Sequence, residues 1–474
     1  MRSPARPLAA ALVASLVVVA AGAAQDALSA PDRQLARDIF RELIEINTTD
    51  SLGNTPRAAR AMAARLRAAG FPAADVQVLI GPDAKHGNLV ARYRGTGTGG
   101  RPIVALAHLD VVPARRADWS VDPFTLLERD GYFYGRGTTD DKVGDAILVA
   151  NFIRLKRAGI RPARDLILVL TGDEETDGSC IQWLVTKHRP LLDAEFALNT
   201  DAGGGVLRDG RRVMFAVQAS EKVYATYVLE ALDRGGNSSL PRPADNPIYR
   251  LAPVLERLAQ YQFPVKLNEV SRAFFERSAA LETGQLADDM RGILKEPPDS
   301  AAVARLSAVP FYNSKLRTTC VATMLEAGHA ENALPQAARA TVNCRILPGE
   351  PAAEVEATLR RLAGDDRITI HTTYTPTPSP PSPLTPAIMR PLERLVGEQF
   401  PNVPIVPIME AGASDGLFLR NAGIPTYGVS AVFEEQNDVR AHGQDERILV
   451  RSFYEALEFW YRMMQTLAGP ASPS

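Results

Sequence analysis

Apolar runs alternate with amphipathic helical stretches in the first half of this chain. The runs at 102–113 and 165–171 contain several consecutive apolar residues, and a shorter run follows at 195–199. Stretches such as 32–43, 57–69 and 144–156 instead repeat apolar residues at helical spacing. Strands buried on both faces lose the usual alternation, and they occur in parallel sheets covered by helices. The pattern therefore predicts an α/β fold with a mostly parallel sheet.

The spacing of apolar and polar residues changes after Val213. The apolar runs and helical stretches of the first half return near the end of the chain. The stretches 222–231 and 338–346 alternate apolar and polar residues, as strands with one solvated face do. Two helical stretches accompany them, and a proline-rich segment at 375–386 ends the region. We therefore predict a catalytic domain in two parts, residues 25–218 and 375–474. An inserted α+β domain separates these parts at 219–374.

The N-terminus has the pattern of a secretory signal peptide. Arg2 and Arg6 precede an apolar run at 8–21 that ends in small residues. A membrane anchor needs about 20 apolar residues, and this run is shorter. We therefore expect residues 1–24 to be removed by a cut near Ala23 or Ala24. The mature protein is then secreted or periplasmic, with no membrane attachment.

The composition gives no sign of a nucleic-acid partner, and it leaves open whether two of the cysteines form a disulfide. The formal net charge is −2, without the basic excess typical of nucleic-acid-binding proteins, so no nucleic-acid partner is expected. Cys180, Cys320 and Cys344 are too few for a disulfide framework, and none has the spacing of a cysteine-type zinc site. Cys320 and Cys344 both lie in strand-like stretches. They either form a disulfide or remain buried thiols, and only geometry decides between these.

Metal-binding side chains follow several of the predicted strands. His108, the pair Glu174 and Glu175, and Asp201 each come at the end of an apolar run, and His442 follows a fourth run. In open α/β sheets, binding sites form beyond the carboxyl ends of the strands. The glycine-spaced turn at 135–142 adds two adjacent aspartates. Mixed histidine and carboxylate ligands suit Zn²⁺, and less exclusively Co²⁺ or Mn²⁺.

The motifs HLDVVP, GRGTTDDK, TGDEETDGS, NTDAGGG, GGNSSLP, ENALPQ, NCRILPG and HGQDER are spread over almost the whole mature chain. They resemble the motifs of the co-catalytic di-zinc peptidases and amidohydrolases. That family includes glutamate carboxypeptidase of the G type, aminoacylase-1, succinyl-diaminopimelate desuccinylase, acetylornithine deacetylase, carnosinase and the Gly-X carboxypeptidases. The motifs occur in the family's order.

The resemblance implies a role for each candidate in a centre of two Zn²⁺ ions. Asp140 would bridge both ions, while Asp141 takes a position that the family does not use as a ligand. His108 and Asp201 would complete one ion's set, and Glu175 and His442 the other's. Glu174 resembles the family's general base. Asp110 resembles the aspartate that orients the ligating histidine ring.

The inserted domain resembles the family's lid and dimerisation domain, with one departure. The family has Gly-Gly-His-Ser-Ser where this chain has Asn237 in place of the histidine. An asparagine amide can still donate one hydrogen bond to an oxyanion, although it offers no protonated ring. By the same resemblance, substrate-binding residues are expected in the lid and in a glycine-rich loop. They are Asn332 and Arg345, which would hold a free carboxylate, and Gly412, Ala413 and Ser414.

These observations together predict an exported metallohydrolase. The favoured substrate is a small peptide with a free carboxylate, cleaved at its amide bond with Glu174 as general base. The alternatives are an N-acyl amino-acid amidohydrolase, and a metal-containing binding protein whose catalysis is weakened by Asn237. An unligated base at Glu174 favours an enzyme, because a binding protein does not need one. A homodimer through the inserted domain is a further expectation.

Overall fold

The computed structural model describes residues 28–469, so the predicted signal peptide at 1–24 lies outside the described residues. A ten-stranded sheet forms the larger part of the molecule, in the order β1-β2-β6-β3-β7-β17-β9-β8-β18, with β16 also paired to β9. Neighbours β6, β3, β7 and β17 run parallel, whereas β1, β2 and β8 have antiparallel neighbours. The mostly parallel sheet expected from the sequence is therefore present. Its strands are β1 (Val76–Ile80), β2 (Gly87–Tyr93), β3 (Ile103–His108), β6 (Leu166–Thr171), β7 (Phe196–Asn199), β8 (Gly204–Arg208), β9 (Arg211–Glu221), β16 (Ile405–Glu410), β17 (Thr426–Gly428) and β18 (Phe433–Glu435).

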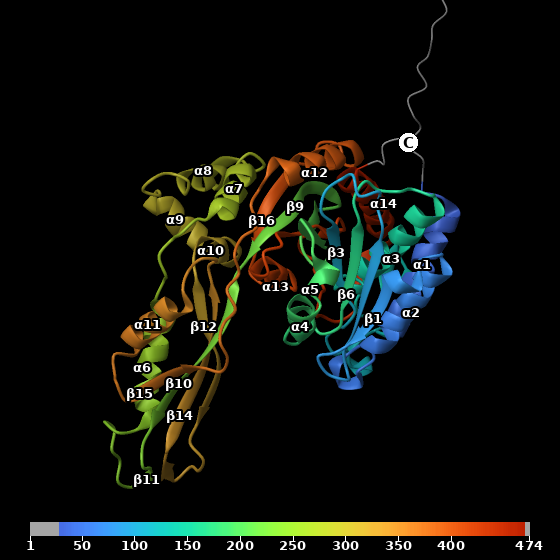
Figure 1. The fold of residues 1–474 in the computed structure, drawn as a ribbon. Helices are drawn as coiled ribbons and strands as arrows, with labels where there is room; N and C mark the ends of the chain where they lie inside the picture. The colour runs from blue at the N-terminus through green and yellow to red at the C-terminus, as the bar shows by residue number, and fades with distance from the viewer. Residues whose placement is uncertain (1–27, 470–474) are drawn as a thin grey trace, which may run out of the picture.

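Helices cover both faces of this sheet, which explains the uninterrupted apolar runs (Figure 1). Alternate residues of β3 pack to opposite sides: Ala105 joins the core under one helical layer, and Leu106 joins the core under the other. Every residue of β3 and β6 is buried as a result. The first layer holds α1 (Ala30–Glu45), α2 (Thr55–Ala68), α3 (Lys142–Arg157), α12 (Pro386–Gln399) and α14 (Val450–Ala468). The second holds α4 (Ser179–Lys187), α5 (Arg189–Leu192) and α13 (Gly416–Asn421).

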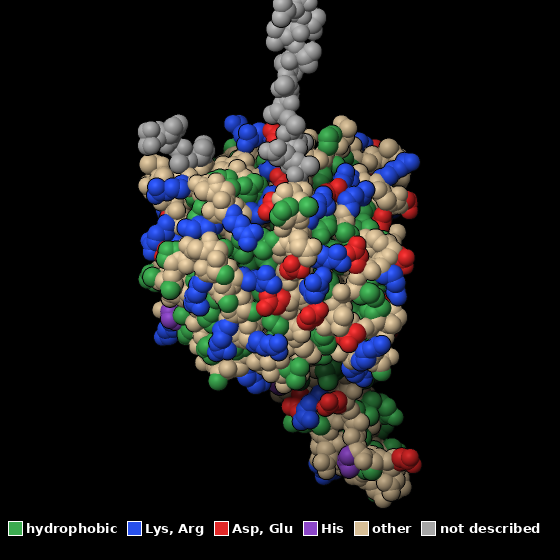
Figure 2. Space-filling view, turned by 90° about the vertical axis from the view of Figure 1, so that its right-hand side faces the viewer, with side chains coloured by type: hydrophobic (Ala, Val, Ile, Leu, Met, Phe, Trp, Pro, Cys, Tyr) green, Lys and Arg blue, Asp and Glu red, His purple; other side chains and the backbone are tan. Residues whose placement is uncertain are grey.

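A separate four-stranded antiparallel sheet, in the order β12-β14-β10-β15, forms the smaller part. Figure 2 shows this part as a narrow extension from a larger body whose visible face carries positive and negative side chains intermixed. The chain passes from one sheet to the other at Lys222, between β9 and β10. Burial alternates along β10 and β14, because helices cover only one face. The elements are β10 (Val223–Leu232), β12 (Thr319–Ala327), β14 (Ala337–Ile346), β15 (Ile368–Thr372), α6 (Pro247–Gln260) and α11 (Ala352–Ala363).

Four short helices between α6 and β12 were not expected from the sequence. They return to the large sheet, where Phe274 and Phe275 share a core with Val406 and Ile408 of β16. In Figure 1 they lie above β12, beside β16. Each is too short to show a clear helical period, and caps such as Asn268 and Asp299 define their starts instead. They are α7 (Glu269–Ser278), α8 (Gly284–Gly292), α9 (Ser300–Ser307) and α10 (Pro310–Leu316).

The remaining short elements lie in connecting loops. The two-stranded pair of β11 and β13 extends from the end of the small sheet farthest from the large one (Figure 1). A small sheet in the order β19-β5-β4 lies next to the turn at 135–142. These elements are β4 (Leu127–Arg129), β5 (Tyr132–Tyr134), β11 (Gly236–Asn237), β13 (Ala333–Leu334), β19 (Arg447–Leu449), and the 3₁₀ helices η1 (Asp50–Leu52), η2 (Ala73–Asp75) and η3 (Arg116–Asp118).

The structure decides the question about the cysteines. Cys320 of β12 and Cys344 of β14 face each other in register and form a disulfide. Cys180 is free and buried. Among residues 28–469, no helix combines the length and apolar character needed to cross a membrane.

Candidate metal centre

The carboxyl ends of neighbouring parallel strands bring the candidate ligands together. His108 is the last residue of β3, Glu174 and Glu175 follow β6, and Asp201 follows β7. These three strands are adjacent, in the order β6-β3-β7, so their ends meet at one edge of the sheet. The turn before α3 adds Asp140 to the same edge.

Asp140 lies between two histidines, with one carboxylate oxygen toward each. Its Oδ1 is 3.0 Å from His108 Nε2, and its Oδ2 is 2.9 Å from His442 Nε2. Asp201 Oδ1 lies 3.7 Å from His108 Nε2, and Glu175 Oε2 lies 3.0 Å from His442 Nε2. Two ligand groups result, His108–Asp140–Asp201 and Asp140–Glu175–His442, and they share Asp140. These are the two sets that the family resemblance implies.

The chemistry of this cluster fits a pair of divalent cations. Nitrogen and carboxylate oxygen donors are the ligands of Zn²⁺ and related ions. Asp140, Asp201, Glu174 and Glu175 also place four carboxyl groups beside two histidines, a density of acidic groups that bound cations would neutralise. Glu175 Oε1 is buried and has no hydrogen-bond partner among the described residues. That oxygen is a further donor available to a cation.

Asp110 connects the end of β3 to the turn that carries the two glutamates. Its two carboxylate oxygens accept hydrogen bonds from the backbone N–H groups of Glu174 (3.1 Å) and Glu175 (2.9 Å). His108 Nδ1 lies 3.1 Å from the Asp110 carbonyl oxygen and 3.5 Å from its carboxylate. Both the carbonyl oxygen and the carboxylate of Asp110 therefore lie beside this ring nitrogen. The carboxylate itself positions Glu174 and Glu175.

Glu174 lies close to the cluster but belongs to neither ligand group. Its Oε2 is 4.0 Å from His108 Nε2, and its side chain is largely buried. Burial and the nearby charge of Asp201 raise the pKa of Glu174 well above its usual range. A carboxyl group in this position can accept and return a proton next to the reacting atoms, which is the role of a general base.

Asp141, the neighbour of Asp140, points away from the histidines into the protein. Its Oδ2 accepts a hydrogen bond from Thr200 Oγ1 at 2.6 Å. Burial raises the pKa of the Asp141 carboxyl well above its usual range. Gly144 packs directly against this pair, and a Cβ atom there would collide with Thr200 Oγ1. The two aspartates are thus separated by their surroundings, one at the metal cluster and one in the interior.

Glu446 and Arg136 hold the aspartate turn against the loop that carries His442, a role that no sequence pattern predicted. Both are fully or almost fully buried, and Arg136 Nη1 donates to Glu446 Oε2 at 2.6 Å. Glu446 also accepts from the backbone N–H groups of Gly137 (3.0 Å) and Thr139 (2.7 Å). Both residues occur in the quoted motifs, but nothing in the one sequence assigned them a role.

We expect Glu446→Ala to lower the free energy of unfolding by about 3–5 kcal/mol, because it leaves the Arg136 charge buried and unpaired. Urea denaturation of the metal-free protein measures this change. The double variant Glu446→Leu with Arg136→Met should lose less, since it removes both charges. An equal loss in the two variants would contradict this explanation.

The predicted substrate-binding residues fall into two separate places. Arg345 Nη1 donates to the Ala411 carbonyl oxygen at 3.1 Å, beside Gly412 and Ser414, and its guanidinium lies 4.5 Å from the centre of the Tyr224 ring. Ser414 Oγ donates to Glu221 Oε2 at 2.8 Å. Asn237 and Asn332 instead lie at the far end of the small sheet, where Ser238 N–H donates to the Asn332 carbonyl oxygen. Within one chain, the first group borders the large sheet and the second is remote from it (Figure 1).

Two further cations accompany Arg345 near the end of β16. Lys315 Nζ donates to the Met409 carbonyl oxygen, and Lys222 Nζ donates to the Arg317 carbonyl oxygen at 2.7 Å. Burial, together with the charges of Lys315 and Arg345, lowers the pKa of Lys222 to about 7. Arg345 makes no salt bridge to a carboxylate among the described residues. Its charge is therefore available for a ligand.

Comparisons with known proteins agree with this geometry. A sequence model described as peptidase family M20/M25/M40 matches residues 104–466. The human N-fatty-acyl-amino acid synthase/hydrolase PM20D1 is 31% identical over 388 residues, which cover 79% of this chain and 75% of that protein. The succinyl-diaminopimelate desuccinylase of Gluconacetobacter diazotrophicus is 33% identical over 60% of this chain and 77% of its own.

Solved structures show the same fold at low sequence identity. An M20 family metallo-carboxypeptidase from Sulfolobus solfataricus is 17% identical, with a TM-score of 0.69 over 91% of this chain and 99% of that chain. Human carnosine dipeptidase 1 is 16% identical, with a TM-score of 0.64 over 92% and 97% of the two chains. At such identities, these likenesses concern the fold alone.

Proposed function

The chain belongs to peptidase family M20/M25/M40, and from this premise we propose that it hydrolyses the amide bond of N-acyl amino acids. It is a metallohydrolase of the peptidase and amidohydrolase type. The main support for a hydrolytic two-cation centre is the position of Asp140 between His108 and His442. There one carboxylate belongs to both ligand groups and can bind both cations. We propose Zn²⁺ as the metal, with Co²⁺ or Mn²⁺ as substitutes.

The metal ligands, Glu174 and Asp110 would each have a different role in hydrolysis. Two cations held by these ligand groups would polarise the amide carbonyl and lower the pKa of a water molecule. Glu174 would take the proton of the attacking water and pass it to the leaving amine. Asp110 supports that transfer by holding the backbone of Glu174 and Glu175 in place. Because Glu174 belongs to neither ligand group, its carboxylate remains free for the proton.

The choice of an N-acyl amino acid over a small peptide rests on relatives. The sequence alone favours small peptides, with deacylation as the alternative. The human relative and a Xenopus tropicalis relative, at 31% and 30% identity, are both named as N-fatty-acyl-amino acid synthase/hydrolases. Small peptides stay the second candidate, because a Dictyostelium discoideum relative at 27% identity is named as a probable carboxypeptidase S-like protein.

Arg345 would bind the free carboxylate that both substrate classes carry. Its guanidinium lacks a carboxylate partner in the described chain, lies beside the loop of Gly412 and Ser414, and is held by Ala411 and Tyr224. Arginine suits this role because its planar donors match the two oxygens of a carboxylate.

We therefore expect the metal-loaded enzyme to hydrolyse N-acyl amino acids and to act poorly on their methyl esters. Arg345→Ala should raise KM for the free acid about 10- to 100-fold, which corresponds to about 1.5–3 kcal/mol for hydrogen bonds to a charged group. The same variant should change KM for the ester little. Steady-state assays of both substrates with both proteins measure this, and dipeptides in the same panel test the second candidate. An equal effect of Arg345→Ala on acid and ester would exclude carboxylate binding by this residue.

We further propose that Asn237 serves the active site of a second chain. Asn237 is exposed at the far end of the small sheet, while the metal ligands lie at the edge of the large one (Figure 1). The edge strand β12 exposes Val321, Met324 and Leu325, with 57–63% of each residue accessible. An exposed apolar edge strand favours pairing with another strand. A dimer formed along β12 would cover these residues.

Mixing two inactive variants tests the shared site. Glu174→Gln and Asn237→Ala homodimers should each be impaired. A mixture of the two, dissociated and reassociated, should regain activity, because some heterodimers contain one site with both Glu174 and Asn237. No gain over the separate variants, or a single-chain mass by light scattering, would contradict the proposal.

A further inference from the structure

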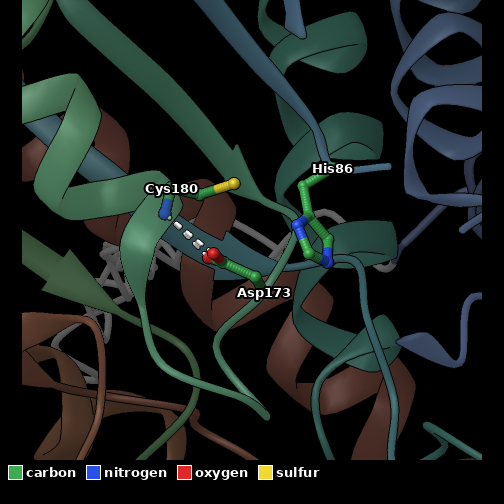
Figure 3. A group of neighbouring side chains, drawn as sticks. All are labelled: His86, Asp173 and Cys180. Carbon is green, nitrogen blue, oxygen red and sulfur yellow. Dashed lines mark hydrogen bonds between the residues drawn. The ribbon is translucent and has the colours of Figure 1, made fainter. Parts of the chain in front are cut away.

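A second cluster of metal-binding side chains lies behind the turn that carries Glu174 and Glu175. It consists of His86, Asp173 and Cys180, which come from the turn before β2, the end of β6 and the first turn of α4. One ligand atom from each residue lies within 4.8 Å of the other two. Figure 3 shows the Cys180 thiol on the side of the His86 imidazole, and the Asp173 carboxylate turned toward the backbone N–H of Cys180. Nothing in the hydrolytic mechanism uses these three residues.

The three side chains are closed off from solvent. His86 is 8% exposed, and Asp173 and Cys180 are fully buried. His86 Nδ1 forms no well-aligned hydrogen bond with the described residues, although Asp83 Oδ1 lies 3.1 Å away. A buried polar atom without a partner is costly, so its presence beside a thiol and a carboxylate indicates a site for a ligand. Asn88 Oδ1, whose amide shares the Gly81 carbonyl with Cys180, is a second such atom.

The surroundings of His86 favour metal binding through this nitrogen. His86 Nε2 lies 3.3 Å from Asp50 Oδ1, and a proton on Nε2 donated to that carboxylate leaves a lone pair on Nδ1. Asp83 Oδ1 lies 3.1 Å from Nδ1 and also accepts the backbone N–H groups of Lys85 and His86, so this carboxylate would be a neighbour of an ion bound at Nδ1. A carboxylate that holds the distant nitrogen of a histidine is the usual support of a metal ligand.

Asp173 retains capacity for a cation although it stabilises the start of α4. Its oxygens accept the Cys180 backbone N–H at 3.0 and 2.9 Å, and Oδ2 accepts the Ser179 hydroxyl. A carboxylate offers about four acceptor positions, so Oδ1 keeps a lone pair. The simpler role of Asp173, capping the helix, accounts for its own bonds. It does not explain why a thiol and an imidazole nitrogen lie beside this carboxylate.

We propose that His86, Asp173 and Cys180 bind one further Zn²⁺-type ion, separate from the hydrolytic pair. A sulfur, a nitrogen and an oxygen donor together favour Zn²⁺ or Co²⁺ over Mg²⁺, Ca²⁺ or Mn²⁺. When the ion binds, the Cys180 S–H proton is released to water and the sulfur–metal bond replaces its hydrogen bond to Gly81. The ion would tie the turn before β2 to the segment that leads into Glu174 and Glu175. Its role is therefore structural.

Because Cys180 is the single free thiol, a metal bound by it can be distinguished spectroscopically from the metals of the hydrolytic centre. Cys320 and Cys344 are joined in a disulfide, so Cys180 is the one thiol of the chain's three cysteines. The hydrolytic centre contains nitrogen and oxygen donors alone. A sulfur-to-cobalt charge-transfer absorption in the near ultraviolet can therefore come only from Cys180.

The test uses the full mature chain, without reductant, stripped by a chelator and titrated with Co²⁺. We expect the charge-transfer absorption to appear in the wild type and to be absent in Cys180→Ala, which should bind one metal equivalent less per chain. Gln182→Ala, on the exposed side of the same helix, is the matched control and should behave as the wild type. Hydrolysis by Cys180→Ala should persist, because both hydrolytic ligand groups are intact.

Two results would overturn the proposal. One is a wild-type protein saturated with Co²⁺ that shows no sulfur-to-cobalt absorption. The other is equal metal content in the wild type and Cys180→Ala. Should Cys180→Ala fail to fold, the wild-type spectrum still decides, and His86→Asn provides a second variant that should weaken the absorption.

Discussion

Glu174→Gln is expected to lower kcat by about 10²- to 10⁴-fold, the contribution typical of a general base. Glutamine has nearly the same shape as glutamate but cannot take a proton at neutral pH, so the attacking water would keep its proton. Substrate binding should change little, because the carboxylate of the substrate is expected at Arg345 instead. Initial rates with an N-acyl amino acid, measured across substrate concentrations, separate the loss in kcat from any change in KM.

Metal content distinguishes this role from a ligand role. Glu174 belongs to neither ligand group, so Glu174→Gln should retain the wild-type number of metal ions per chain. Glu435→Gln, on the edge strand β18 of the same sheet, is a suitable control and should keep both metal and activity. A Glu174→Gln enzyme with kcat within a few-fold of the wild type would exclude the general-base role. A loss of metal in that variant would instead make Glu174 a ligand.

Asp140→Ala is expected to abolish activity and to weaken metal binding at both positions of the centre. Each ligand group contains Asp140, through Oδ1 beside His108 and Oδ2 beside His442. Removing one carboxylate therefore takes a ligand from each cation at once. In the wild type, added Zn²⁺ at about 100 times its Kd should stabilise the folded state by about 2.7 kcal/mol. This metal-dependent rise in Tm should largely disappear in Asp140→Ala.

Asp141→Asn is the matched control for Asp140, because it changes the adjacent residue of the same turn. The amide oxygen of the new side chain could still accept the hydrogen bond from Thr200, and burial keeps the pKa of the Asp141 carboxyl high in the native protein. We expect this variant to retain metal and most of its activity. If Asp141→Asn loses metal as fully as Asp140→Ala, the assignment of the bridge to Asp140 is wrong.

The large sheet was predictable because the burial of each strand is visible in a short stretch of sequence. β3 and β6 are buried on both faces, and that leaves near-continuous apolar runs in the sequence. The alternation along β10 and β14 likewise follows from a sheet with helices on one face. The short helices α7 to α10 were missed because each spans too few residues to repeat an apolar face.

The residues of the metal centre were predictable for a different reason. His108, Glu174, Glu175 and Asp201 follow strands, and adjacent parallel strands bring their ends to one edge. The bridging role of Asp140 and the assignment of His442 to one of the two ions came from the family resemblance, which also divided the ligand candidates into two groups. The structure brings the same groups together. That they hold metal stays a prediction, which the Asp140 and Glu174 variants test.

The sequence by itself therefore determined the fold class, the strand ends that meet, and the kinds of donor atoms available there. Only the tertiary structure shows the surroundings that separate the two members of a pair, although the family resemblance had already implied different roles for Asp140 and Asp141. Asp140 and Asp141 are identical in chemistry, and they differ because one faces two histidines and the other faces Thr200. The same holds for Glu446 and for the group of His86, Asp173 and Cys180. Their partners lie 7 to 310 residues away along the chain, and no local pattern records such contacts.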